Sequence, residues 1–234
     1  MSANSQTFSV TPRGADVLGE LLHSLSQPLT SLRCSLELSL ANDEKTDPRQ
    51  ETVSIALQQT ERVIGMVQLM REYVEAEQPG PDANPSAMAP VARSVTEELC
   101  SIAAVRDIGL RLAGTCTATL PLPESRLRLA LQYLIVSLLE AQQDGSKVML
   151  LLGEGPAGAV LRAEGYSSLR AADFQYRQDG GLRQARSEGS TASSALRRAR
   201  LAVARRLLET AGASLIFGNS AAHGFVLRVP PLSH

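Results

Sequence analysis

Residues 18–36 read LGELLHSLSQPLTSLRCSL, with leucines at alternating spacings of four and three residues. The series consists of Leu18, Leu22, Leu25, Leu29, Leu32 and Leu36. This spacing is typical of a coiled-coil-like seam along one side of an α-helix. Pro28 lies within the stretch, where it removes a backbone hydrogen bond and should kink the axis. We therefore expect one long, kinked helix over residues 13–41.

A second apolar seam lies in residues 49–77, which are also predicted to form a helix. Its members are Val53, Ala56, Thr60, Val63, Val67, Met70 and Val74. A short polar turn separates the two helices and ends in Pro48, a residue favoured at the first position of a helix. Two long helices joined in this way form an antiparallel hairpin. Pairing two hairpins covers the apolar stripe that one leaves open, so we expect a homodimer held by a four-helix bundle.

The rest of the chain has a different composition and periodicity. Residues 79–87 are rich in proline and small residues, and are predicted to be a linker. Beyond it we expect helices mixed with antiparallel strands, so the fold class is α+β with an α/β-sandwich domain. The predicted organisation is a flexible N-terminus (1–12), a helical hairpin (13–78), the linker and the α/β domain (88–234). The helices expected there are 88–104, 124–143 and 195–211, and the strands are 147–152, 159–163, 214–217 and 225–229.

Composition argues against several classes of protein. Lys and Arg number 23 against 24 Asp and Glu, and aromatic residues make up only 3%, so we expect no nucleic-acid partner. The N-terminus lacks the apolar core of a signal peptide, and no apolar stretch approaches the ~20 residues that span a bilayer. We therefore expect a cytoplasmic protein without membrane insertion. The three cysteines lack metal-type spacing, which favours reduced structural thiols and no metal site.

His23 is the first candidate for chemistry. Each residue of an ideal helix advances about 100°, which puts His23 about 140° from the leucine seam. It therefore shares an outward stripe with Gln27, Thr30 and Cys34. An exposed neutral imidazole carries a lone pair near physiological pH and can act as a nucleophile. From helix geometry alone, an ordinary surface histidine is the simpler interpretation.

The residues around His23 change this balance. Residues 23–32, HSLSQPLTSL, resemble the phosphoacceptor box of histidine kinases, where a His precedes a polar residue one turn on, then Pro-Leu and often Thr-Ser. The resemblance implies that His23 accepts a phosphoryl group. It departs at Ser24, because the family usually has Asp or Glu there as a base, and serine is a poor base. Gln27 lies where relatives carry a polar residue associated with phosphatase activity; an amide can position water or a phosphoryl group, although an exposed Gln is commonly only solvated.

The second half of the chain resembles the ATP-binding domain of the same kinases over most of its length. The resemblance puts Glu140 where the family has its magnesium-binding Asn, and Ala163 where it has the Asp that reads adenine, ahead of a retained Gly165. Arg198 and Arg200 replace two glycines whose backbone approaches phosphate. A carboxylate repels a triphosphate, and bulky arginines obstruct it. The combination implies a degenerate ATPase-like domain that binds no ATP, although the arginines could instead hold phosphate in a new way.

The helix expected to contain Arg198 and Arg200 is strongly basic. Such a run is commonly a solvated face. The alternative is a surface for an acidic partner, and the resemblance supplies one, because receiver domains of response regulators present acids around their phosphorylated Asp. The predicted partner-binding residues are therefore Ser24, Thr30, Arg198 and Arg200.

These expectations combine into one functional hypothesis. The chain is expected to be a histidine phosphotransferase, in which His23 takes a phosphoryl group from one receiver domain and passes it to another. Such transfer depends on positioning, and magnesium comes with the receiver, so the chain needs no cofactor of its own. A hybrid histidine kinase is a further candidate partner. The alternatives are a non-catalytic adaptor, or pseudokinase, that sequesters a receiver or kinase, a divergent active histidine kinase, and a receiver phosphatase using Gln27.

Overall fold

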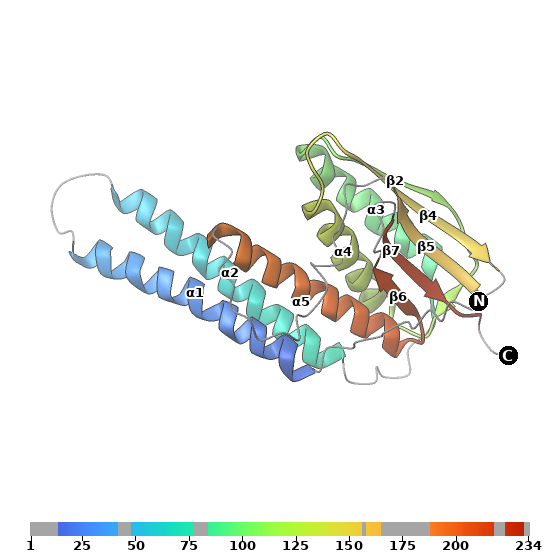
Figure 1. Ribbon diagram of the computed structural model, residues 1–234, viewed down its shortest axis with the longest axis horizontal. Coiled ribbons are helices and arrows are strands. Elements are labelled where there is room, and N and C mark those ends of the chain that lie inside the picture. Colours follow the sequence, from blue (N-terminus) through green and yellow to red (C-terminus); the bar gives the residue numbers. More distant parts are fainter. Residues whose placement is uncertain are drawn as a thin grey trace, which may run out of the picture. The chain divides into compact units, whose positions relative to one another are not determined.

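The computed structural model describes six segments of the chain, which Figure 1 draws as coloured ribbon. They are residues 14–41, 48–76, 84–155, 158–164, 188–217 and 223–231. The predicted flexible N-terminus, residues 1–12, lies outside them, as do residues 79–83 of the predicted linker. The chain divides into two compact units, Met1–Met66 and Val67–His234. The division falls inside the second long helix.

Two long helices make up the N-terminal part of the chain, as the seams predict. α1 is Gly14–Ala41 and α2 is Pro48–Ala76, so every bound lies within one residue of the expected position. α2 begins at Pro48, whose fixed φ suits a first helical position and whose missing N–H has no helical partner there. Pro28 lies inside α1 without ending it. None of the helices in the described segments has both the length and the apolar character that crossing a membrane requires.

The leucine seam of α1 is largely open to solvent within one chain. Leu22 and Leu29 are 58% and 44% exposed, whereas their neighbours Leu21 and Pro28 are buried. A long uncovered apolar stripe of this kind marks an interaction face. A second copy of the chain is one occupant of such a face, and the four-helix bundle stays a prediction. The seam residues of α2 that are also exposed are Val53, Val67 and Val74.

The second unit is a two-layer α/β sandwich. Its strands are β1 (Ser86–Ala87), β2 (Gly109–Gly114), β3 (Thr119–Leu120), β4 (Lys147–Gly155), β5 (Gly158–Glu164), β6 (Ser214–Phe217) and β7 (His223–Val229). β1 pairs with β3, and the other strands form one sheet in the order β2-β4-β5-β7-β6. Three helices, α3 (Met88–Val105), α4 (Glu124–Glu140) and α5 (Glu188–Thr210), lie on one side of this sheet (Figure 1).

The core of the second unit lies between these helices and the sheet. Burial alternates along β4 and β5, because successive side chains of a strand point to opposite faces. Leu150 and Leu161 are fully buried on the sheet, and Leu131 and Leu138 are fully buried on α4. The apolar face of each layer is thus covered by the other, which fixes α4 and α5 against the sheet and against each other.

β2 is not among the strands expected from the sequence. Its residues, GLRLAG, include two glycines and an arginine, and give a weak local signal for a strand. It pairs in parallel with β4, from Gly109 opposite Lys147 to Gly114 opposite Leu152. The sheet is therefore mixed, which corrects the expectation of antiparallel strands alone. A parallel pair needs a crossover connection, and α4 provides it here.

The C-terminal end of α4 is held by Arg106. Its guanidinium donates to the carbonyl oxygens of Leu139 (2.9 Å) and Gln142 (2.7 Å), at a helix end where carbonyls have no intrahelical partner. Its Nε also donates to Oδ1 of Asp144 at 2.9 Å. α4 ends at Glu140, three residues before the expected bound. These bonds place the last turn of α4, and with it Glu140, in a defined position.

Candidate functional site

His23 lies on an exposed face of α1. The side chains of Gln27, Thr30 and Cys34 are also exposed and follow it at spacings of four, three and four residues. The Thr30 hydroxyl donates to the carbonyl oxygen of Ser26 at 2.8 Å. We call the four residues His23, Gln27, Thr30 and Cys34 the His23 face. It presents an imidazole and an amide to solvent, one helical turn apart.

Ser24 lies on a different side of α1. Its side chain is 8% exposed and is in register with the buried Leu21 and Pro28. One residue along a helix is a rotation of about 100°, so Ser24 does not share the direction of His23. A partner that binds the His23 face therefore meets little of the Ser24 side chain.

A second group of the predicted residues meets between α4 and α5. Nη1 of Arg200 lies 2.5 Å from Oε1 of Glu140. Arg197, one turn earlier on α5, places its Nε 3.9 Å from Oε2 of the same carboxylate. The side chains of Glu140, Arg197 and Arg200 are 35%, 18% and 21% exposed. We call these three residues the arginine–glutamate cluster. Its members are partly withdrawn from solvent, and Arg200 donates a hydrogen bond to Glu140, whereas Arg197 is beyond hydrogen-bond distance.

The side of α4 that faces this cluster is polar over two turns. Tyr133, Ser137 and Glu140 are spaced by four and three residues, which places them on one face of the helix. The Tyr133 hydroxyl donates to the carboxylate of Glu72, in the last turns of α2, which belong to the second unit. Burial raises the pKa of Tyr133, the bond to Glu72 raises it further, and the positive charge of Arg200 acts in the opposite direction. Arg200 thus acts electrostatically on Tyr133 as well as on Glu140.

Two buried polar atoms in this region have no hydrogen-bond partner among the described residues. They are Oγ of Ser137, whose residue is fully buried, and Nε of Arg197. Buried polar groups are nearly always paired, so two unpaired groups in one small region are uncommon. The cluster and the neighbouring face of α4 therefore hold hydrogen-bonding capacity that their present contacts leave unused.

Two of the other residues singled out for the nucleotide positions lie on β5 and α5. Ala163 is fully buried on β5, where it lies opposite Leu150 of β4, and its methyl group has no acceptor for an adenine amino group. Arg198 is half-buried on α5. Gly165 lies outside the described residues. In the described segments, no group of three or more His, Cys, Asp or Glu side chains is arranged to hold a metal ion.

Sequence reasoning named Glu140 and Arg200 separately and did not pair them. It also missed Tyr133 and Ser137. A signal was present in the spacing of 133, 137 and 140, which marks one helix face, and in the opposite charges at 140 and 200. That signal becomes informative only with the packing of α4 on α5, because spacing within one helix does not say which neighbour the face meets.

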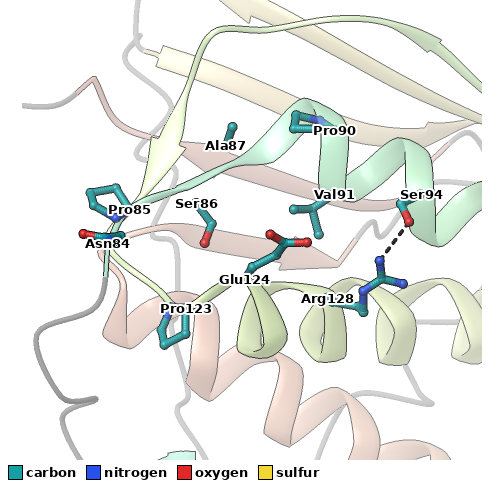
Figure 2. A pocket seen from close by; sticks show the side chains of 10 residues that line it. All are labelled: Asn84, Pro85, Ser86, Ala87, Pro90, Val91, Ser94, Pro123, Glu124 and Arg128. Carbon is teal, nitrogen blue, oxygen red and sulfur yellow. Dashed lines mark hydrogen bonds between the residues drawn. The ribbon is translucent and has the colours of Figure 1, made fainter.

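A separate pocket of about 720 Å³ lies where the first turns of α3 and α4 come together (Figure 2). Its lining includes Ser86, Ser94, Glu124 and Arg128. The Arg128 guanidinium donates to Oγ of Ser94 at 2.8 Å and to Glu98 at 2.9 Å. The guanidinium is thus engaged by the chain itself, and none of the residues singled out from the sequence lines this pocket.

Comparison with known proteins identifies the fold. No family model matches the chain, and no curated protein does. Among solved structures, the histidine kinase AdeS of Acinetobacter baumannii is similar with a TM-score of 0.67 and 15% identity, over 90% of this chain and 98% of that one. Full-length ShkA, in complex with AMPPNP, is similar with a TM-score of 0.53 and 14% identity, over 92% of this chain and 44% of that one. At such identities the likeness is one of fold, and we conclude from it that the chain has a histidine kinase-like fold.

Proposed function

We propose that this protein is a histidine phosphotransferase of two-component signalling. His23 accepts a phosphoryl group from the phosphorylated Asp of one receiver domain and donates it to the Asp of another, without use of ATP. The observation that carries the proposal is the solvent-exposed His23 imidazole within a sequence that resembles a phosphoacceptor box, in a chain with a histidine kinase-like fold.

The proposed transfer exchanges one bond to phosphorus for another. An unprotonated ring nitrogen of His23 attacks the phosphorus of the acyl phosphate, the bond from phosphorus to the Asp oxygen breaks, and the carboxylate leaves. The other ring nitrogen gives its proton to solvent. The second step runs these events in the opposite direction onto a new carboxylate. A carboxylate is a good leaving group, so the reaction depends on alignment, and the magnesium ion that comes with the receiver reduces the charge at phosphorus.

The residue after His23 favours an acyl phosphate, and not ATP, as the phosphoryl donor to His23. Ser24 supplies a hydroxyl, which is a poor base at neutral pH, and its side chain is buried. A kinase that activates its own His for attack on ATP benefits from a base at that place. A phosphotransferase has less need of one, because its donor carries the better leaving group.

The residues at the nucleotide positions do not fit ATP. A triphosphate near Glu140 meets a carboxylate of like charge, and Arg200 is already bonded to that carboxylate at 2.5 Å. Ala163 provides no acceptor for adenine. We therefore propose that the α/β domain serves as a docking and shape element and needs no cofactor.

We further propose that two copies of the chain pair through the exposed leucine seam into a four-helix bundle. The receivers would bind at the His23 face, which includes Thr30. Arg198 and Arg200 of the α/β domain are further proposed partner-binding residues, and Arg200 reaches a partner only by leaving Glu140. A hybrid histidine kinase is the proposed upstream partner, and a cytoplasmic location stays a prediction.

The test is a transfer experiment across the receiver domains of the host. Each receiver is phosphorylated, freed of its donor and mixed with the full chain, and label on the chain is followed with time. We expect label on the wild type and on Ser26→Ala, a substitution at an exposed residue of α1 outside the His23 face, but none on His23→Ala. Label on His23→Ala, or no label from any receiver, would contradict the proposal.

A second candidate is a non-catalytic adaptor that binds a receiver and sequesters it. The buried Ser24 side chain and the Glu140–Arg200 pair fit an adaptor as well as they fit a phosphotransferase, because neither feature requires chemistry at His23. His23→Gln separates the two functions. If signalling in the host survives this substitution in full while receiver binding is unchanged, the adaptor is the better description.

A further inference from the structure

The five-stranded sheet of the α/β domain has one face that α3, α4 and α5 do not cover (Figure 1). Side chains alternate along each strand, so the buried residues identify the helix side and the more exposed ones identify the other face. The register agrees, because Arg162 of β5 lies opposite both Leu151 of β4 and Val226 of β7. We call the uncovered side the open sheet face. Its apolar members among the described residues are Ala113, Met149, Leu151, Val160, Ile216 and Val226.

The open sheet face is more apolar than a face that only meets water. A strand with one solvated face normally alternates between apolar and polar residues. Residues 148–152 of β4 instead read VMLLL, an uninterrupted apolar run that is typical of a strand covered on both faces. Ile216 of β6 is 46% exposed and lies opposite Val226, another apolar residue. The sequence of the sheet therefore fits a layer with a second neighbour.

Positive charge predominates on the open sheet face. Its described basic residues are Arg111, Lys147, Arg162 and Arg228, and its described acid is Glu164. Glu164 pairs with Arg162 at 2.9 Å. The other three basic side chains have no ion pair with any described residue. The face therefore keeps unpaired positive charge on a chain whose net charge is only −1.

The acids near the edges of this face do not cancel that charge. Glu154 of β4 has the opposite parity and accepts a hydrogen bond from the Thr117 hydroxyl at 2.6 Å. Asp107 and Asp144 belong to the loops before β2 and β4, at the end of the sheet where Lys147 lies. They reduce the effect of Lys147 more than that of the arginines further along the strands. Arg111 and Arg228 are thus the main unpaired charges.

We propose that the open sheet face docks an acidic amphipathic helix of a partner protein. The apolar side of that helix covers Leu151, Val160 and Ile216, and its carboxylates meet Arg111 and Arg228. Complementary charge selects the acidic partner, and the apolar residues require an element with one apolar side. Four strand spacings of about 4.8 Å separate β2 from β6, so a helix that crosses the sheet has about 13 residues. This inference goes beyond the proposed function, because it requires nothing of the His23 face.

The order of residues on the open sheet face favours a protein partner over a lipid surface. Arg162 lies between Leu151 and Val226 in one cross-strand row. Arg228 lies beside Val160 in the next row. A helix that binds a membrane separates the apolar side that enters the bilayer from its basic side. Here the two kinds of residue alternate, so the arginines would enter the apolar layer with their neighbours, whereas a partner helix can place a carboxylate beside each of them.

The test uses two stapled synthetic helices of about 13 residues. Both have leucines along one side; the remaining positions are glutamate in one helix and lysine in the other. Fluorescence anisotropy measures the binding of each to the full chain at low ionic strength. We expect the glutamate helix to bind at least about tenfold more tightly than the lysine helix, and Arg228→Glu to abolish this preference. Arg93→Glu is the matched control and should bind like the wild type, because Arg93 is exposed on α3, on the other side of the sheet (Figure 1).

A second pair of variants tests the apolar part of the face. Ile216→Thr keeps a β-branched side chain and removes apolar area, so it should weaken binding of the glutamate helix at least about threefold. Ile102→Thr is its control, because Ile102 is 56% exposed on α3. It should leave the affinity unchanged. Equal losses in the two variants would mean that the helix does not bind on the open sheet face.

Several results would overturn the proposal. They include equal binding of the two helices by the wild type, and equal losses in Arg228→Glu and Arg93→Glu, since the attraction would then depend on net charge alone. If Arg228→Glu does not fold by circular dichroism, Arg228→Gln must show a loss in the same direction. Binding to phosphatidylserine vesicles in place of the glutamate helix, lost in Arg228→Glu, would assign the face to a membrane. Self-association lost in the same variant would assign it to a second copy of the chain.

The failure of this inference is separable from that of the proposed function. Arg228→Glu should still take label from a phosphorylated receiver at the wild-type rate, because the open sheet face has no part in the chemistry at His23. Loss of the glutamate helix with label retained rejects the docking surface alone. Binding of the helix by a chain that takes no label from any receiver rejects the phosphotransferase alone.

Discussion

The His23 face and the arginine–glutamate cluster treat their polar groups in opposite ways. On the His23 face, the imidazole and the Gln27 amide are exposed to solvent. In the cluster, Glu140 and Arg200 are bound to each other and partly withdrawn from water. An exposed polar group keeps its water and remains available for chemistry, whereas a half-buried charge must be paired. The contrast teaches that the polar groups of the His23 face are open to a partner as they stand, whereas Glu140 and Arg200 must first be separated from each other.

The largest effect expected from this contrast is that of His23→Gln. We expect the rate of phosphoryl transfer to fall at least about a thousandfold, because an amide has no lone pair basic enough to attack phosphorus. The melting temperature should move by less than about 1 °C, since the side chain is exposed. Rapid-quench labelling and a thermal melt measure the two quantities. A rate within tenfold of the wild type would remove His23 from the mechanism.

A charge placed in the leucine seam should have the next largest effect. Leu29 is 44% exposed in one chain, and Leu29→Glu would place a carboxylate in the apolar seam of the proposed dimer. We expect the dimer dissociation constant to rise at least about a hundredfold, as measured by analytical ultracentrifugation. Ile102→Glu is the control, because Ile102 is 56% exposed on a different helix, α3, and is not one of the seam residues. A wild type that sediments as a monomer would end the dimer proposal.

Arg106→Ala tests how the α/β domain positions its charges. The substitution removes hydrogen bonds to the carbonyls of Leu139 and Gln142 at the end of α4. We expect the free energy of unfolding to fall by about 2 kcal/mol, because carbonyls at a helix end lose their charged donor. Urea denaturation measures it, with the exposed Arg111→Ala on β2 as control, expected to change stability by less than about 0.5 kcal/mol. Equal losses in the two variants would mean that Arg106 does not hold α4.

The smallest effect should be that of Tyr133→Phe, which removes the hydroxyl that donates to Glu72. We expect a loss of about 1 kcal/mol near neutral pH. The pKa of Tyr133 is raised in the folded chain, so the stabilisation is present in full below the unfolded value of about 10 and is lost as pH rises through the folded pKa. Chemical denaturation at pH 7 and above pH 10 checks this. A difference from the wild type that grows with pH would have the wrong sign.

How much could be predicted from the sequence depended on the range of the interactions. α1 and α2 were placed to within one residue, because their seams repeat over many turns and the cues are local. The outward direction of His23 also followed from helix geometry. β2 was missed, because its strand character comes from pairing with β4 and not from its own residues. The Glu140–Arg200 pair joins residues 60 apart, so it depends on how α4 packs on α5.

The bond between Glu140 and Arg200 also constrains how the chain can evolve. Loss of the carboxylate alone leaves two like charges facing each other, and loss of Arg200 alone leaves Glu140 with a single guanidinium at 3.9 Å. Each intermediate is less favourable than either the present pair or two neutral residues, since breaking a withdrawn ion pair costs more than replacing it whole. We therefore expect substitutions at positions 140 and 200 to occur together, because a change at one position alone leaves the remaining charged side chain poorly paired.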